Sequence, residues 1–278
     1  MKTYKLIRSI ILAVSLLFCM PLPAMASELN DGAQYLIKEV SEPEYGAIGG
    51  EWTVTAVWNG ASQYPKECFE NYYADIEKTV KKCKGVLSED TYTEYSRVVI
   101  ALECINKNPK NVAGYDLAAP LMDYDKVSYQ GINGVAYALL ALDAGRFTGP
   151  RIRYIDYIIN SELPDGGWNL FGKGDADPDI TAMVLRAIAP YRNRYKVKKA
   201  IDSSMQVMKG NLSSSESISQ CILAYDALQI DSEKESLKKE LLRYQNHDGG
   251  FKHSLDEEES NIMSTEQALM ALSVFERD

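Results

Sequence analysis

The sequence is poor in the residues that bind zinc or activate a nucleophile through an imidazole. Its 278 residues include two histidines, His247 and His253, which flank one Asp-Gly-Gly turn. A zinc site needs several protein ligands at a consistent spacing, and a nucleophile-and-base triad needs a histidine close to the nucleophile. The sequence therefore predicts no metal centre and no triad of the serine-hydrolase type.

Positive charge is also scarce. Lys and Arg number 30 against 39 Asp and Glu, so the net charge is −9. Three of the basic residues, Lys2, Lys5 and Arg8, lie in a segment that we expect to be removed. Nucleic acids and anionic membranes bind through basic surface, so we expect neither as a partner.

The apolar run at Ile10–Met20 is too short to span a bilayer comfortably. It follows a positively charged start and precedes Ala24 and Ala26, small residues at the positions that a signal peptidase reads. The sequence therefore predicts a signal peptide over 1–26, cleaved after Ala26. The mature domain, 27–278, is expected to be secreted and not membrane-embedded.

Cysteine spacing shows no disulfide framework in the mature chain. Cys68 and Cys83 would lie about 22 Å apart on one helix at ~1.5 Å per residue, too far to pair. Cys104 and Cys221 fall in rows of small apolar residues, where a buried thiol behaves as a small hydrophobe. We expect thiols rather than disulfides.

Strand signals are almost absent, since no long alternating apolar run occurs and no Asn-Gly or Asp-Gly turn joins β-branched stretches. The sequence instead contains one apolar phrase, rich in small residues, that recurs six times and is clearest at Gly131–Leu142. The repeats have a period of roughly 43 residues, and periods of this length are typical of repeated supersecondary units. One aligned small residue from each copy is Ala56, Cys104, Ala141, Ala187, Ala227 and Ala271.

The segments between these copies are amphipathic. In 149–162, for example, Ile152, Ile155 and Ile158 form one stripe, whereas the recurring phrases are apolar nearly all round and should be buried. This alternation predicts six pairs of an outer and an inner helix. The pairs are 30–39 with 48–60, 64–84 with 92–106, 114–123 with 131–144, 150–161 with 178–191, 194–209 with 215–229, and 233–245 with 262–275.

The last copy is as apolar as the middle ones, whereas an open solenoid usually carries polar caps at both ends. We therefore expect closure into a double ring, an all-α (α/α)6 toroid of about twelve helices that forms a single domain over 27–278.

Two related loops carry a family resemblance. Residues 164–168 read Pro-Asp-Gly-Gly-Trp, and 245–251 read Gln-Asn-His-Asp-Gly-Gly-Phe, which fits the Gln-x-x-x-Gly-x-Trp repeat of squalene and terpenoid cyclases with Phe251 for Trp. With Asp-Pro-Asp-Ile-Thr-Ala-Met at 177–183, the chain resembles the prenyltransferase and squalene-cyclase repeat superfamily of α/α toroids. In style it is most similar to secreted bacterial terpenoid-cyclase-like toroids and to the helical domain of the cobalamin carriers transcobalamin and intrinsic factor. The resemblance is specific for fold and weak for function.

In cyclases of this superfamily, the middle Asp of Asp-x-Asp-Asp-Thr-Ala protonates an alkene. The resemblance would give this role to Asp179, with Asp177 beside it, but Ile180 replaces the last Asp of the motif. A neighbouring carboxyl helps to hold such an acid neutral. We therefore expect Asp179 to be charged, with its pKa set by helix-start amides and solvent, and we expect no cyclase turnover.

Metal sites of related proteins are not reproduced either. Protein prenyltransferases of the superfamily bind zinc through Asp, Cys and His in a pattern that His247 and His253 do not follow. The spacing of Asp175, Asp177 and Asp179 starts like an EF-hand loop, but the later glycine and glutamate of that loop are missing.

Residues at the starts of the inner helices would surround one mouth of a closed ring. They combine carboxylates, aromatic rings and an arginine, as a small-molecule or peptide site requires. The predicted ligand-binding set is Glu51, Trp52, Glu94, Tyr95, Arg97, Asn133, Tyr137, Asp177, Asp179 and Thr181.

We therefore expect a secreted, non-catalytic binding or cell-surface interaction module without a cofactor. Its partner would be a small molecule, a glycan, a peptide or a separate surface protein. Three alternatives stay open. One is a cyclase-like enzyme that uses Asp179. Another is a cobalamin carrier subunit, which would need a partner protein as its lid because the chain ends at Asp278 without a β domain. The third is a carbohydrate-active toroid with Glu51, Glu94 and Asp179 around one cavity.

Overall fold

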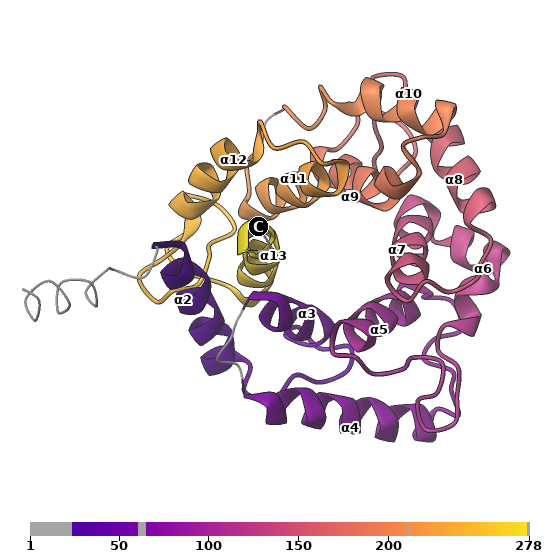
Figure 1. Cartoon of the computed structure of the whole chain (residues 1–278), viewed down its shortest axis with the longest axis vertical. Coiled ribbons are helices and arrows are strands. Elements are labelled where there is room, and N and C mark those ends of the chain that lie inside the picture. The colour runs from indigo at the N-terminus through magenta and orange to yellow at the C-terminus, as the bar shows by residue number, and fades with distance from the viewer. Residues whose placement is uncertain (1–23, 61–64, 211, 277–278) are drawn as a thin grey trace, which may run out of the picture.

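The computed structural model describes residues 24–60, 65–210 and 212–276, and this part of the chain is helical (Figure 1). It contains no strand, only three isolated β-bridges. Most of the predicted signal peptide, residues 1–23, lies outside the described residues. No helix in the described ranges is long and apolar enough to cross a membrane. The prediction of an all-α fold is confirmed.

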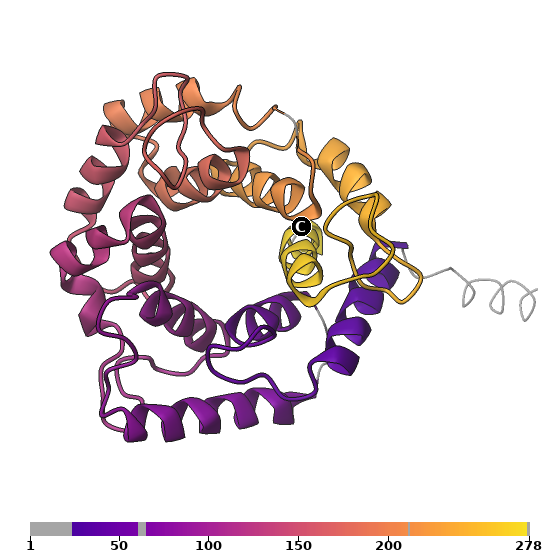
Figure 2. The ribbon, with the colours of Figure 1, turned by 180° about the vertical axis from the view of Figure 1, so that it is seen from behind.

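The α-helices form two layers, and Figures 1 and 2 show the inner layer arranged around the middle of the molecule. The inner helices are α3 (Glu51–Gly60), α5 (Thr93–Cys104), α7 (Gly131–Ala144), α9 (Pro178–Ile188), α11 (Ser215–Leu228) and α13 (Ile262–Leu272). The outer helices are α2 (Ala24–Glu39), α4 (Lys66–Lys82), α6 (Tyr124–Tyr129), α8 (Arg151–Asn160), α10 (Tyr195–Ser204) and α12 (Lys234–Leu241). Short 3-10 helices are η1 (Ala119–Met122), η2 (Ala189–Tyr191), η3 (Leu242–Tyr244) and η4 (Ser273–Glu276).

Each inner helix packs against the next, and α13 packs against α3. The layers differ in burial as the sequence pattern predicts. The outer helix α8 buries a stripe of Tyr154, Ile155 and Ile158, whereas the inner helix α11 buries most of its residues, because α9, α12 and α13 all pack against it. Cys221 on α11 is fully buried, and burial raises the pKa of its thiol to about 12. The four cysteines of the described residues are all thiols.

The inner helices start at the same end of the molecule, as contacts between their first turns show. The Gln130 side chain, at the cap of α7, accepts the N–H of Thr93 on α5 at 2.8 Å. Glu216 on α11 accepts the hydroxyl of Ser264 on α13, and Glu266 on α13 accepts the hydroxyl of Thr53 on α3. We call this end, formed by the starts of the six inner helices, the rim.

The two Asp-Gly-Gly loops have the same geometry. The N–H of Trp168 donates to the hydroxyl of Thr181 at 3.0 Å, and the N–H of Phe251 donates to the hydroxyl of Thr265 at 2.8 Å. Both rings are buried between the layers. The turns have positive φ at Gly166 (79°) and at the equivalent Gly249 (87°), and a Cβ at Gly166 would lie 2.6 Å from the Ser203 carbonyl oxygen. Only glycine suits such a position.

The third outer helix is where the prediction was wrong. Residues 114–123 do not form one helix, because a turn closed by a Val112–Tyr115 bridge occupies the start of this range. The Asp116 carboxylate then accepts two of the following backbone N–H groups, at 2.9 and 3.0 Å, and Pro120 lies in the first turn of η1. The short helix α6 begins only after Asp123, whose side chain caps it by accepting the N–H of Lys126. Side-chain caps and a proline outweigh the weak helical pattern here.

Candidate functional site

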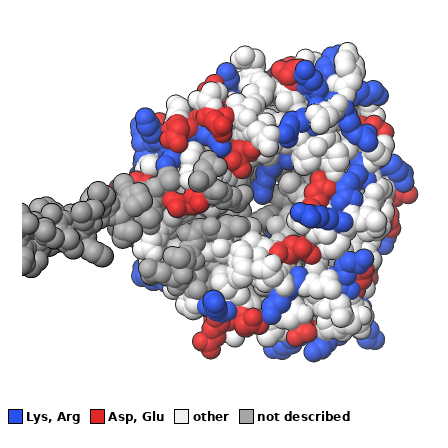
Figure 3. Space-filling view, viewed as in Figure 1, with Lys and Arg blue, Asp and Glu red and all other residues white. Residues whose placement is uncertain are grey.

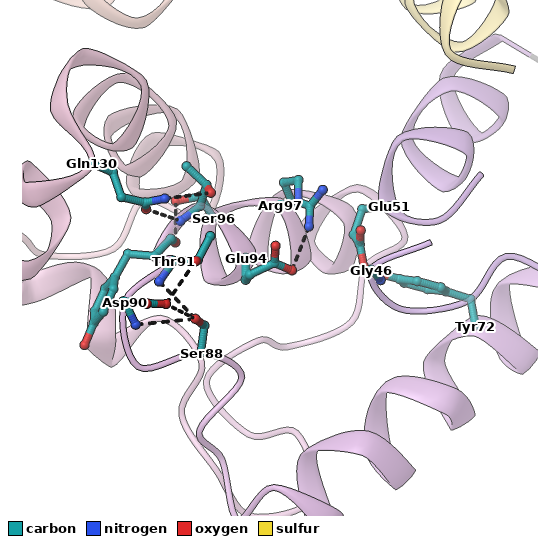
Figure 4. Close-up of polar contacts among 12 residues, drawn as sticks. Gly46, Glu51, Tyr72, Ser88, Asp90, Thr91, Glu94, Ser96, Arg97 and Gln130 are labelled. Atoms are coloured by element: carbon teal, nitrogen blue, oxygen red, sulfur yellow. Dashed lines mark hydrogen bonds and ion pairs between the residues drawn. The ribbon is translucent and has the colours of Figure 1, made fainter. Parts of the chain in front are cut away.

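An ion pair stands at the rim where α3, α5 and α7 meet. Arg97 Nη2 lies 2.6 Å from Glu94 Oε2, and each side chain keeps about a quarter of its surface exposed. Figure 4 shows both side chains on one side of α5, with Arg97 between Glu94 and Glu51. The Nε of Arg97 is buried, and none of the described residues provides it with a hydrogen-bond partner. This N–H is therefore a donor that lacks an acceptor among the described residues.

Aromatic rings border this ion pair. The rings of Trp52 and Tyr137 lie 5.6 Å apart at an interplanar angle of 45°, and both are half-buried. Burial raises the pKa of the Tyr137 hydroxyl, while Arg97 and Arg186 lower it electrostatically. The hydroxyl of Tyr45, in the loop before α3, hydrogen-bonds Glu94, and burial raises its pKa. We call Tyr45, Trp52, Glu94, Arg97 and Tyr137 the rim cluster.

Glu51 stands beside the rim cluster and has a structural role. Its side chain is only 2% exposed, and Oε1 accepts the N–H of Gly46 at 3.1 Å and the hydroxyl of Tyr72 on the outer helix α4 at 3.4 Å. Burial raises the pKa of its carboxyl, and the charge of Arg97 lowers it. The sequence placed Glu51 in the mouth. The structure places it between the layers, where it holds the loop before α3.

Three other members of the predicted ligand-binding set also have structural roles. Tyr95 is buried, and its hydroxyl donates to the Ser88 carbonyl and accepts the N–H of Leu87. Thr181 is fully buried against the Trp168 loop, as described above. Asp177 is the N-cap of α9, because its Oδ1 accepts two N–H groups of the first turn at 2.9 and 3.0 Å. The prediction that Tyr95 and Thr181 line the mouth was therefore wrong.

Asn133 lies half-buried in the first turn of α7. Its place at the rim stays a prediction.

A second polar cluster stands at the rim where α9, α11 and α13 start. Glu216 contacts His253 Nδ1 at 2.8 Å through one oxygen and accepts the Ser264 hydroxyl through the other. Asp179 accepts a hydrogen bond from the Ser217 hydroxyl. Asp179 and Glu216 each occupy the second position of an inner helix, where the helix dipole favours a carboxylate.

The pKa of Asp179 corrects the prediction from its sequence context. Burial raises this pKa, and the charges of Asp177 and Glu216 raise it further, whereas the Ser217 hydrogen bond and His253 lower it. The sequence suggested that helix-start amides and solvent would favour the charged form. It missed the burial, and it missed Glu216, a nearby carboxylate from the next inner helix. The loss of an acid at Ile180 is therefore partly offset.

The geometry limits the chemistry of this second cluster. Ser264 donates to Glu216 and not to His253, so the imidazole is not placed to activate that serine as a triad would. Across the described ranges, no group of three or more His, Cys, Asp or Glu side chains is arranged to hold a metal ion. Glu94 and Asp179 belong to separate clusters, with α7 between their helices.

The last inner helix is joined to the first through a buried carboxylate. Glu266 is 3% exposed and accepts both the hydroxyl and the backbone N–H of Thr53 in the first turn of α3. Burial raises the pKa of Glu266 to about 7, and the charge of Glu51 adds to the rise. The side chain satisfies one of the N–H groups that a helix start leaves without an intrahelical partner.

Sequence reasoning missed Tyr45, Glu216, His253 and Glu266. Tyr45 and His253 lie in loops, and only the packed chain shows which helix start each loop crosses. Glu216 occupies the same second position of its helix as Glu94 and Asp179. Aligning the helix starts rather than the small residues would have found it.

Comparison with known proteins adds no family assignment. No protein-family model, curated protein or solved structure matches the chain. The resemblance to the cyclase superfamily therefore stays a prediction from the motifs.

Proposed function

We propose that the chain is a closed (α/α)6 toroid, a distant relative of the prenyltransferase and squalene-cyclase repeat superfamily. The packing of α13 on α3 and the Glu266–Thr53 contact support closure, because the last repeat then has a neighbour on both sides. The repeated hydrogen bonds at Trp168 and Phe251 support a shared ancestry of the two loops.

On this fold, we propose a secreted, non-catalytic binding module whose ligand occupies the rim cluster. The ligand is a small molecule, a glycan or a peptide that presents an oxygen acceptor next to an apolar or sugar-like face. Aromatic surface with a few polar groups is the usual composition of such sites.

The observation that carries this proposal is the buried, partnerless Nε of Arg97 beside the Trp52–Tyr137 pair. A buried donor without an acceptor costs on the order of 1–3 kcal/mol, and a ligand oxygen would remove that cost. The carboxylates that catalysis would need are engaged elsewhere, since Glu51 holds a loop and Asp177 caps a helix. The structural engagement of these two carboxylates favours binding over acid–base catalysis.

The test begins with protein purified from its own host. Native mass spectrometry should detect a retained molecule, and Trp52→Ala combined with Arg97→Ala should lose it. The control combines Trp58→Ala with Arg153→Ala. Trp58 lies on the same helix but packs on Phe69, and Arg153 stacks on Tyr124 at the outer layer, so the control should retain the molecule.

Circular dichroism and the thermal midpoint would show that both variants stay folded. Equal retention of the molecule by the two double variants would place the site away from the rim cluster and refute the proposal.

One observation keeps a second function in view, namely a general acid at Asp179 as in the cyclase-like alternative. Its raised pKa is the property that alkene protonation requires. Incubation with squalene and with geranylgeranyl diphosphate, followed by product analysis, decides between the two. We expect no cyclic product, because the Ser217 hydroxyl stabilises the ionised carboxylate. A cyclic product that disappears in Asp179→Asn would establish the enzyme instead.

A further inference from the structure

A separate concavity lies at the far ends of α7 and α9, away from the rim. It has a volume of ≈ 570 Å³ and is lined by the end of α7, the loop that follows it, the start of α8 and η2. Because α7 rises ~1.5 Å per residue, its two ends are roughly 20 Å apart. No residue of the rim cluster lines this pocket, so it is distinct from the site proposed above.

One wall of the pocket is a hydrogen-bonded ion pair. Arg151 Nε donates to Asp143 Oδ1 at 2.6 Å, and its Nη2 donates to the Leu142 carbonyl at 2.7 Å. The hydroxyl of Tyr191 lies 2.8 Å from each oxygen of Asp143. These contacts hold the pair in a fixed geometry, and the charges of Asp143 and Arg151 balance each other.

The other wall carries an unbalanced cation. Arg146 is exposed, and its guanidinium has no ion pair or hydrogen bond to any residue in the described ranges. It follows the C-cap of α7 at a left-handed φ of 51°. The adjacent Phe147 ring lies directly over Gly145, where an added Cβ would stand 2.1 Å from a ring atom. Phe147 also lies 5.8 Å from Lys110 Nζ, a further positive charge nearby.

We propose that this pocket binds a small organic monoanion. Its carboxylate contacts the guanidinium of Arg146, and its flat apolar body lies against Phe147, Pro190 and the ring of Tyr191. Arg146 supplies a positive charge that attracts a carboxylate, with Lys110 nearby, whereas the Asp143–Arg151 pair adds no net charge to the wall. Arginine suits a carboxylate through its fork of donors, and the exposure of Arg146 lets a ligand reach it.

The test uses benzoate as the probe in a nuclear magnetic resonance titration of the mature protein. Benzoate should produce saturable shifts in the amides of 145–149 and 191–192, with an affinity on the order of millimolar for so small a ligand. Benzyl alcohol, which has the same ring without the charge, should bind at least tenfold more weakly. Inorganic phosphate, which has charge without the ring, should also bind at least tenfold more weakly than benzoate.

The decisive variant is Arg146→Gly. Glycine accepts the left-handed conformation at this position more readily than arginine, so the variant should fold and show a higher thermal midpoint. Its benzoate affinity should nevertheless fall at least tenfold. Arg153→Gln is the control, because Arg153 stacks on Tyr124 outside the pocket. This variant should bind benzoate as the wild type does.

Wild-type affinity in Arg146→Gly would overturn the proposal, as would equal binding of benzyl alcohol and benzoate. Shifts confined to residues outside the pocket would also overturn it. Because these readouts involve only the far ends of α7 and α9, a failure here would leave the proposal for the rim cluster intact.

Discussion

Glu266 should make the stability of the protein depend on pH. Its pKa of about 7, against an ordinary value of 4.5, means that the folded state holds this proton more tightly than the unfolded state. Below about pH 4.5 both states are protonated and the full stability is present. As the pH rises towards 7 the unfolded state ionises first, so stability falls. The shift corresponds to about 3 kcal/mol at 1.36 kcal/mol per unit.

The perturbation that isolates this effect is Glu266→Gln. Glutamine has the same shape, and its amide oxygen can accept the hydroxyl and the N–H of Thr53, but it stays neutral at every pH. The free energy of unfolding of the variant minus that of the wild type should therefore grow by about 3 kcal/mol between pH 4 and pH 8. Other carboxyls with raised pKa, such as Asp179, titrate in both proteins and largely cancel.

Urea denaturation at the two pH values measures this difference directly. Glu235→Gln, an exposed site on α12, controls for the loss of one negative charge and should change the free energy of unfolding by less than about 0.5 kcal/mol. A Glu266→Gln difference that is the same at pH 4 and pH 8 would refute the assignment of Glu266 as a buried carboxyl with a raised pKa.

Three further outcomes are expected. Gly166→Ala should destabilise the fold by about 3 kcal/mol in urea denaturation, because a Cβ would meet the Ser203 carbonyl at positive φ. The control Gly172→Ala, also at positive φ but in open space, should cost about 1 kcal/mol. Equal costs would contradict the close packing of the first Asp-Gly-Gly loop. Asp177→Ala should cost about 1 kcal/mol through the lost cap of α9, and Asp175→Ala, next to the cap, should cost less than about 0.5 kcal/mol by the same measurement. Protein recovered outside the cell should begin at Ser27 in N-terminal sequencing, and a chain that starts at Met1 would contradict the predicted signal peptide.

Charged side chains of both signs are mixed over one face of the molecule. On the face shown in Figure 3, Lys and Arg lie interspersed with Asp and Glu around the inner layer. A mixed surface of this kind exerts little long-range attraction on a strongly charged polymer. Under the two binding proposals, recognition then depends on local geometry, at Arg97 beside the Trp52–Tyr137 pair and at Arg146 next to Phe147.

Local patterns in the sequence determined most of the helices and both Asp-Gly-Gly loops. Helical periodicity depends on residues three or four positions apart, and turn chemistry depends on immediate neighbours, so both can be recognised without the fold. Trp168 and Phe251 occupy the buried positions that their loops predict. The third outer helix escaped prediction because Asp116 and Pro120 replace a helical turn with a cap and a 3-10 turn.

Tertiary packing alone decided which polar side chains share a site. Glu266 meets Thr53 across 213 positions of sequence, and His253 meets Glu216 across 37. Burial of Asp179 likewise depends on the helices packed beside it and not on Ile180, its neighbour in the chain. The position of a helix start is a local property of the chain, whereas the pKa and the partners of a side chain there depend on every element that excludes water from it.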